Sequence, residues 1–187
     1  MAIVHKATLT PTKAELIGGW LPNQPWYDGP VPPKPRPVGS FRIDDPAGEV
    51  GVETILAEVA DGSHWHIPMT YRAAPLDDDS HLIGVLEHSV LGTRYVYDAI
   101  GDPVYRAVVA DTITGGGRQA QQLRDNGDGT IEPVPVTMTS RGTGGGDGEV
   151  QLVRRPNEPT GQESADGSGV LIGALVDGPD LVLARLA

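Results

Sequence analysis

An Asp-Gly pair between two runs of strand-forming residues constrains the fold of this chain more than any other feature. Asp61-Gly62 is the kind of dipeptide that favours a two-residue turn between antiparallel strands. In the register that such a turn predicts, Val52 on the first strand lies opposite Tyr71 on the second. The segment therefore predicts a β-hairpin within an antiparallel sheet.

The second strand of this hairpin alternates between large apolar residues and a second set that is mainly polar. The first set is Trp65, Ile67, Met69 and Tyr71, and the second set is His64, His66, Pro68 and Thr70. Successive side chains on a strand point to opposite faces, so we expect the first set to face the core and the second to face solvent. Val52 and Leu56 are expected to join this core face from the other strand. Pro68 has no N–H to donate, which predicts a sheet edge or a bulge there.

Two short helices are predicted, one on each side of this segment in the sequence. Thr10 as N-cap and Pro11 as the first helical residue predict a helix over residues 11–21. Asp102 and Pro103 repeat this pattern and begin a second helix, which a run of glycines ends. The apolar stripe of the second helix is expected to be Val104, Ala107 and Val108.

The last third of the chain changes to a composition rich in glycine, glutamine, aspartate and threonine. Short strands are expected within residues 130–140 and 149–155, followed by a polar loop over residues 156–169. Two apolar runs, residues 169–175 and 181–187, flank a turn and predict a terminal β-hairpin. Its apolar face needs a cover, which we expect either the rest of the chain or a second copy to supply.

The charge and composition of the chain narrow its classes of partner. The 187 residues carry a formal net charge of −11, and the Lys and Arg residues are scattered. Phosphate backbones and anionic lipids repel such a chain, so we expect neither nucleic acid nor membrane as a partner. The sequence shows no membrane-spanning apolar run and no signal-peptide pattern. The absence of cysteine excludes disulfides and thiolate metal sites and favours a cytoplasmic protein.

Motifs that would carry metal or catalytic chemistry fail on their spacing. His64 and His66 point the same way on a strand, as two zinc ligands do, but the predicted register places aliphatic residues opposite them. Another histidine or a carboxylate remains able to reach them through the fold. Residues 125–130, DNGDGT, resemble a calcium loop, yet Pro135 stands where a bidentate glutamate belongs. Neither a P-loop nor a G-x-S-x-G elbow is present, so we predict no catalytic residues, no metal and no cofactor.

Two aromatic-rich stretches resemble the start of actinobacterial maltokinases and related aminosugar kinases. WLPNQPWYDG, residues 20–29, resembles their W-L-x-x-Q-x-W-[YF]-x-G motif. YVYDAIGDPVY, residues 95–105, resembles the Tyr-Asp segment that leads into a helix of the same cap region. The stretch from residue 161 onward is similar to the first kinase hairpin that follows this cap. The chain thus resembles stand-alone proteins with a maltokinase N-terminal cap-like domain, some of which are labelled α-glucan branching proteins.

The resemblance implies an α+β fold, in which a curved, cystatin-like antiparallel sheet with packed helices precedes a small β-hairpin region like that of a kinase N-lobe. It implies a cap-like domain over residues 1–114 and a β-rich extension over residues 115–187. The motif residues expected to anchor the cap are Trp20, Gln24, Gly29, Tyr97, Asp98 and Pro103. The catalytic loop and the magnesium-binding aspartate of the kinases have no counterpart here, and Ala184 stands where they carry a phosphate-contacting lysine.

The function implied by the resemblance is association without catalysis. The expected partner is an enzyme of α-glucan, trehalose or aminosugar metabolism, or a second copy of the chain. Two other classes stay open: a carbohydrate-binding module in which Trp26, Tyr27 or Trp65 stacks on sugar rings, and a kinase-like or glucan-transferring fragment completed in trans. We expect Trp20 and Trp26 to be core anchors, since burial of such a side chain contributes about 2–3 kcal/mol to stability.

Overall fold

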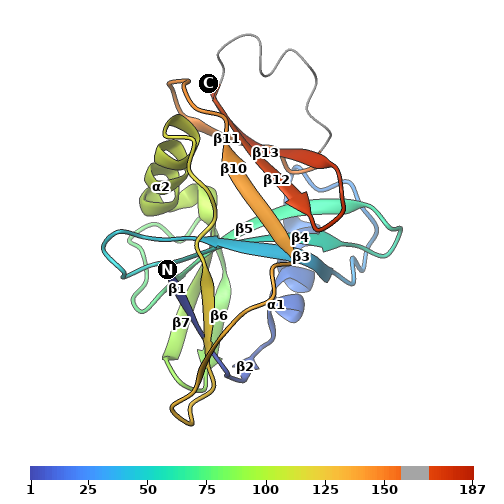
Figure 1. The fold of residues 1–187 in the computed structure, drawn as a ribbon. Coiled ribbons are helices and arrows are strands. Elements are labelled where there is room, and N and C mark those ends of the chain that lie inside the picture. Colours follow the sequence, from blue (N-terminus) through green and yellow to red (C-terminus); the bar gives the residue numbers. More distant parts are fainter. Residues whose placement is uncertain (157–168) are drawn as a thin grey trace.

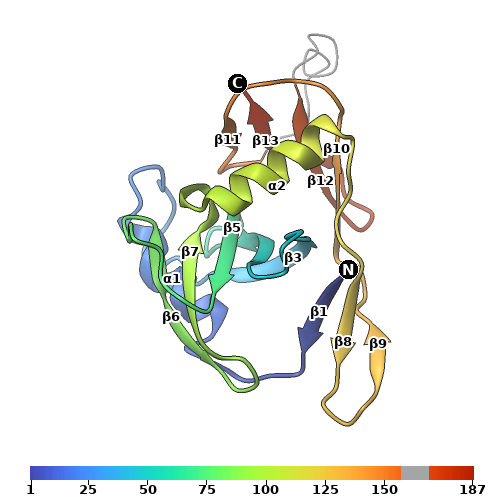
Figure 2. The ribbon, with the colours of Figure 1, turned by 90° about the vertical axis from the view of Figure 1, so that its left-hand side faces the viewer.

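A six-stranded antiparallel sheet curls through the molecule (Figures 1 and 2). The computed structural model describes residues 1–156 and 169–187. The strand order of this curled sheet is β2-β6-β7-β5-β4-β3. In chain order its strands are β2 (Leu9–Thr10), β3 (Arg36–Ile43), β4 (Gly51–Glu58), β5 (His64–Arg72), β6 (Leu82–His88) and β7 (Gly92–Asp98). The two α-helices of the described residues are α1 (Lys13–Trp20) and α2 (Pro103–Thr114), so the fold is mostly β.

Two smaller sheets flank the curled sheet. The first has the order β1-β8-β9, with β1 (Ala2–His5) parallel to β8 (Gln122–Asp125) and β9 (Ile131–Pro133) antiparallel to β8. The second has the order β10-β12-β13-β11. Its strands are β10 (Met138–Gly142), β11 (Val150–Leu152), β12 (Val170–Leu175) and β13 (Asp180–Leu186). β12 and β13 form the predicted terminal hairpin, while the predicted polar loop lies almost wholly outside the described residues.

The predicted hairpin of β4 and β5 forms, but its register differs by one residue from the expected one. Val52 pairs with Thr70, whereas the prediction placed it opposite Tyr71. The strands are joined by a loop over residues 59–63 instead of a two-residue turn. In that loop the Asp61 carboxylate accepts hydrogen bonds from the N–H and the hydroxyl of Ser63. Such a side-chain-stabilised turn lengthens the connection and moves the register with it.

This shift of one residue changes which side chains share a face. Trp65, Ile67 and Met69 pack in a cluster with α1, whereas Val52 and Leu56 pack on the opposite face in a cluster with α2. The expected common core face is therefore wrong, because a slip of one residue moves a strand's side chains to the other face. Both faces of β5 are covered. His66, Pro68 and Thr70, which were expected to face solvent, are therefore also buried, and only His64 at the end of the strand is exposed.

Pro68 lies at a ladder edge, as its missing N–H predicted. β7 pairs with β5 only from Met69 onward, so no strand of the curled sheet faces the nitrogen side of Pro68. The N–H of His66, two residues earlier on that side, donates instead to the carbonyl of Arg154 at 2.9 Å. A proline is tolerated where the ladder has already ended.

The start of α1 differs from the prediction, whereas the start of α2 confirms it. Thr12 is the N-cap of α1, and its hydroxyl and the Glu15 carboxylate each accept the other residue's N–H in a capping box. Thr10 instead pairs with Glu87 in the curled sheet. The Asp102 carboxylate caps α2 by accepting the Val104 N–H at 2.9 Å.

Helix α2 joins the curled sheet to the four-stranded sheet through one continuous core. Its buried residues are Tyr105, Val108, Val109, Thr112 and Ile113, a stripe with i, i+3, i+4, i+7 and i+8 spacing. Ala107, expected in the stripe, is exposed because the stripe begins at Tyr105. Leu171 and Leu183 of the terminal hairpin pack in the same cluster, so this chain covers that face of the hairpin. None of the described helices is long and apolar enough to cross a membrane.

Candidate functional site

The aromatic side chains that stood out in the sequence form one packed cluster. Trp26 lies between Trp20 and Trp65, with ring centroids 5.5 and 5.9 Å away, and Tyr27 lies 4.7 Å from Trp65. Trp65 is 0% exposed and Trp20 is 8% exposed, while Trp26 and Tyr27 are partly buried. The Trp65 indole donates to the Ser63 hydroxyl at 3.3 Å. The cluster is thus part of the core on the α1 side of the sheet.

Two arginines from the segment after β11 lie over this cluster. The Arg154 guanidinium lies 4.2 Å from the ring centroid of Trp26, and that of Arg155 lies 5.0 Å from the centroid of Trp65. A cation over an aromatic face is attracted by the ring and occupies the surface on which a pyranose would stack. Trp65, which was a candidate sugar platform, therefore has no free face for a sugar.

Buried polar groups fix the same arginine segment to the curled sheet. Arg154 forms an ion pair with buried Asp98, and its carbonyl accepts the His66 N–H. His66 Nδ1 lies 3.2 Å from the Val153 carbonyl. Burial, with the nearby charge of Arg154, lowers the pKa of His66 to about 3, so the neutral ring donates to that carbonyl. His66 is thereby engaged in packing, and the described ranges hold no group of three His, Asp or Glu residues arranged to bind a metal ion.

The remaining motif residues stabilise segments of the chain that lie next to strands of the curled sheet. The Gln24 side chain donates to a carbonyl at the end of α1 at 3.2 Å. The hydroxyl of buried Tyr97 accepts a backbone N–H from the loop before β6 at 2.9 Å. A Cβ at Gly29 would lie 2.6 Å from the ring of Tyr27, so a larger residue would displace that ring. Pro103 is the first residue of α2.

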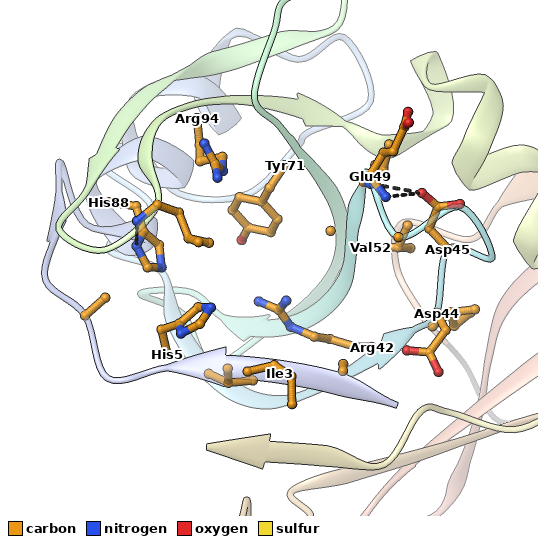
Figure 3. Close-up of a pocket in the computed structure, with 18 of the residues that line it drawn as sticks. Ile3, His5, Arg42, Asp44, Asp45, Glu49, Val52, Tyr71, His88 and Arg94 are labelled. Atoms are coloured by element: carbon orange, nitrogen blue, oxygen red, sulfur yellow. Dashed lines mark hydrogen bonds between the residues drawn. The ribbon is translucent and has the colours of Figure 1, made fainter. Parts of the chain in front are cut away.

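A second feature of the same sheet face is an open pocket of about 720 Å³, bounded on one side by β1 (Figure 3). Its lining comes from β1, the start of α1, the β3–β4 connection, Tyr71 of β5, and the β6–β7 hairpin. In Figure 3, the side chains of Arg42, His5 and His88 point toward one another, and Arg94 lies above Tyr71. A volume of this size is typical of small-molecule sites.

A buried carboxylate lies beneath this pocket. Glu53 accepts hydrogen bonds from Lys13 Nζ at 2.6 and 2.8 Å and from the Tyr71 hydroxyl at 2.7 Å, and it lies 3.8 Å from Arg42. Burial alone would raise its pKa, but the charges of Lys13 and Arg42 and these hydrogen bonds outweigh burial and lower the pKa of Glu53 to about 2. Burial, together with Glu53, raises the pKa of Tyr71 well above its usual value. The phenol is therefore a hydrogen-bond donor at neutral pH.

This pocket could not be predicted from the sequence, because its residues come from strands far apart in the chain. Sheet register brings them together: Arg42 pairs with Glu53, and Arg94 pairs with Leu86. No pattern in the sequence indicated the pocket, because Arg42 alternates with the buried residues Phe41 and Ile43 as any residue on the less buried face of a strand does.

Residues 20–102 match the family model described as the maltokinase N-terminal cap domain. Over these residues, called the cap-like domain below, the chain is similar to that family. This finding confirms the resemblance carried by the Trp20 and Tyr97 motifs and links the chain to maltokinase-type proteins. No curated protein matches the chain.

The cap-like domain supplies most, but not all, of both features. It contributes the whole aromatic cluster, and the arginines that cover the cluster follow β11, outside the matched residues. It also contributes Arg42, Tyr71 and Arg94 to the pocket, whereas His5 comes from β1. Each feature therefore depends on contacts between the cap-like domain and another part of the chain.

Proposed function

We propose that this protein is a non-catalytic, cytoplasmic cap-like protein that acts by association with a maltokinase-type enzyme of α-glucan, trehalose or aminosugar metabolism. The observation that carries the proposal is the core that runs from the cap-like domain through α2 into the four-stranded sheet. A cap joined in this way to a second sheet presents one preformed surface to a partner, which reduces the entropy that binding costs.

The buried charges support a structural use of the cap-like domain. Asp98 is paired with Arg154, and Asp102 accepts two hydrogen bonds from Arg72 at 2.7 Å while it caps α2. Glu53 is bound by Lys13. Each of these carboxylates is paired with a cation, and each pair joins two segments of the fold, which is a common role of a buried, paired charge.

We further propose that two parts of this chain correspond to two parts of a kinase. In this correspondence, residues 1–114 are the cystatin-like cap and residues 115–187 resemble the first kinase hairpin region. The partner would then supply the catalytic lobe or act on the sugar itself. Self-association is the competing form of association within the same proposal.

Co-purification followed by reconstitution tests this proposal. The tagged chain is recovered from the producing organism under several growth conditions, with the tag alone as control, and each captured enzyme is then purified and mixed with the untagged chain. We expect a maltokinase-type or α-glucan enzyme to form a complex of defined mass by light scattering. Recovery of no sugar-metabolism enzyme, or a chain that only pairs with itself, would contradict the proposed partner.

A further inference from the structure

In the described part of the chain, two arginines of the pocket beside β1 have no carboxylate within hydrogen-bond distance. Lys13 forms a close ion pair with Glu53, whereas Arg42 lies 3.8 Å from the same carboxylate, which is too far for a hydrogen bond. Arg42 Nε is buried and has no hydrogen-bond partner. Among the described residues, Arg94 donates to the carbonyl of its neighbour Thr93 and has no carboxylate partner. Two guanidinium groups thus keep unused donors at one pocket.

Two of the three carboxylates on the other side of the pocket are already engaged, and the third, exposed Glu49, lies on that same side, apart from Arg94 and His88 (Figure 3). Asp45 accepts the backbone N–H groups of Ala47, Glu49 and Val50, which outweigh its partial burial and lower its pKa. Asp44 forms an ion pair with the amine of Met1. In Figure 3 both aspartates lie apart from Arg94 and His88. These acids therefore do not neutralise the arginine side of the pocket.

His88 adds a further donor to the arginine side. Its Nδ1 accepts the N–H groups of Val90 and Leu91 at 3.2 and 3.1 Å, so the ring proton of the neutral form is on Nε2. Partial burial and the charges of His5, Arg94 and Arg42 lower the pKa of His88, which places all of these groups within electrostatic reach of one ring.

An apolar rim lies next to this set of donors. Ile3 on β1 and Leu91 in the β6–β7 connection are 39% and 43% exposed, and both line the pocket. Exposed aliphatic side chains beside convergent donors are typical of sites that bind an organic ligand with one charged group.

We propose that this pocket binds a small organic phosphate monoester, with Arg42, Arg94 and the His88 ring as donors to the phosphate and the apolar rim against the organic group. Three donor groups match the three terminal oxygens of a phosphate better than the two oxygens of a carboxylate. This binding site is independent of the association proposed above, since it needs no partner protein.

Calorimetric titration of the full chain tests the site with defined probes. Phenyl phosphate is the phosphate monoester, benzoate carries a carboxylate on the same ring, and inorganic phosphate lacks the organic group. We expect phenyl phosphate to bind more tightly than either of the other two. Heat indistinguishable from dilution at about 10 mM phenyl phosphate, where a millimolar site would be filled, overturns the proposal. Equal affinity for benzoate overturns the phosphate assignment.

A matched pair of arginine variants assigns the binding to this pocket. Arg94→Gln removes a pocket cation, and Arg36→Gln removes a cation that pairs with Glu58 at the far end of β3 and is 66% exposed. Loss of one charge-assisted contact predicts affinity for phenyl phosphate about 10-fold weaker in Arg94→Gln and within about twofold in Arg36→Gln. Equal weakening in both variants would mean non-specific charge attraction and overturns the site.

A conservative variant keeps the test decisive if Arg94→Gln fails to fold. Arg94→Lys retains the charge but loses the paired donors of the guanidinium, so its affinity for phenyl phosphate should also fall. Thermal unfolding of each variant checks that the fold is intact. Unchanged affinity in a folded Arg94→Lys variant contradicts the assigned role of Arg94 as a bidentate donor.

Discussion

The aromatic cluster and the β1 pocket lie on the same face of the curled sheet, yet one is filled and the other is open. In the cluster, Arg154 and Arg155 each lie over an indole ring and each meet a carboxylate. In the pocket, Arg94 meets no carboxylate among the residues that the structure describes, and the buried Nε of Arg42 has no hydrogen-bond partner there. Arginines therefore serve packing in the first region and remain available for a ligand in the second.

This contrast shows why aromatic residues alone are a poor guide to a binding site. Two of the three tryptophans of the chain come from one short motif, for which a core anchor was expected and a sugar platform was the alternative. The structure uses that motif to close the core, and it places Arg154 and Arg155 on the ring faces. A buried donor without a partner beside a pocket, such as Arg42 Nε, is the stronger indication of a ligand, because leaving such a donor unsatisfied is costly.

The largest expected effect is the loss of the buried indole at the centre of the cluster. Trp65→Ala should lower the free energy of unfolding by about 3–5 kcal/mol, since the side chain is fully buried. Trp26→Ala, at a partly buried position, should cost less. Urea denaturation followed by circular dichroism measures both. A cost below about 1.5 kcal/mol for Trp65→Ala would show that the cluster is not a packed core.

The second effect concerns the arginine that joins the cap-like domain to the segment after β11. Arg154→Met leaves the buried Asp98 carboxylate without its cation and should cost about 3 kcal/mol of unfolding free energy. Arg155→Met is the matched control: its side chain is 54% exposed and its partner Asp28 is also exposed, so we expect less than about 1 kcal/mol. Equal costs in denaturant titrations would contradict the proposed difference between the two pairs.

The third effect is a pH dependence that originates at His66. Its folded pKa is about 3 and its ordinary value is 6.5, so between these values the unfolded chain binds a proton that the folded chain does not. Stability should therefore fall as pH is lowered below 6.5, with a contribution of about 1.4 kcal/mol per pH unit. Glu53, whose pKa is lowered from 4.5 to about 2, adds its own loss only below pH 4.5.

Comparison of two histidine variants isolates this contribution between pH 6.5 and 4.5. His66→Gln should reduce the dependence of unfolding free energy on pH in that window to the part contributed by His88, whose pKa is also lowered, while His64→Gln, at the exposed end of the same strand, should retain the wild-type slope. Denaturant titrations at several pH values measure the slopes. The same slope in both variants would contradict a buried neutral His66.

The smallest stability effect is expected in the pocket. Arg94→Gln should change the free energy of unfolding by no more than about 0.5 kcal/mol, because no buried carboxylate depends on Arg94. Thermal and urea denaturation give the value. A cost close to that of Arg154→Met would mean that Arg94 has a structural partner and that the two regions do not differ as described.

Local signals in the sequence predicted the helices and strands more accurately than the register and packing of those elements. The cap of α2 at Asp102 and the terminal hairpin were predictable, because a capping aspartate followed by proline and two apolar runs around a turn act locally. The register of β4 and β5 was not, since Asp61 builds a longer loop through its side chain. That single shift moved Val52 to the other face of the sheet.

Within the candidate site, only the buried aromatic anchor residues could be predicted from the sequence. Trp20 was expected to be buried, and it is. Arg155 covers Trp65, and Arg42 and Arg94 line one pocket, through contacts between residues distant in sequence, which no spacing rule encodes. Such sites become visible only once register and long-range packing are fixed.

Mapping of ligand-induced shifts in nuclear magnetic resonance spectra tests the central contrast most directly. The isotope-labelled chain is titrated in parallel with phenyl phosphate and with maltose, and backbone amide and indole N–H signals are followed. We predict that phenyl phosphate shifts the amides of Arg42, His88 and Arg94, while the indole signals of Trp20, Trp26 and Trp65 stay unchanged with either ligand. Indole shifts with maltose and silent pocket amides with phenyl phosphate would contradict the account.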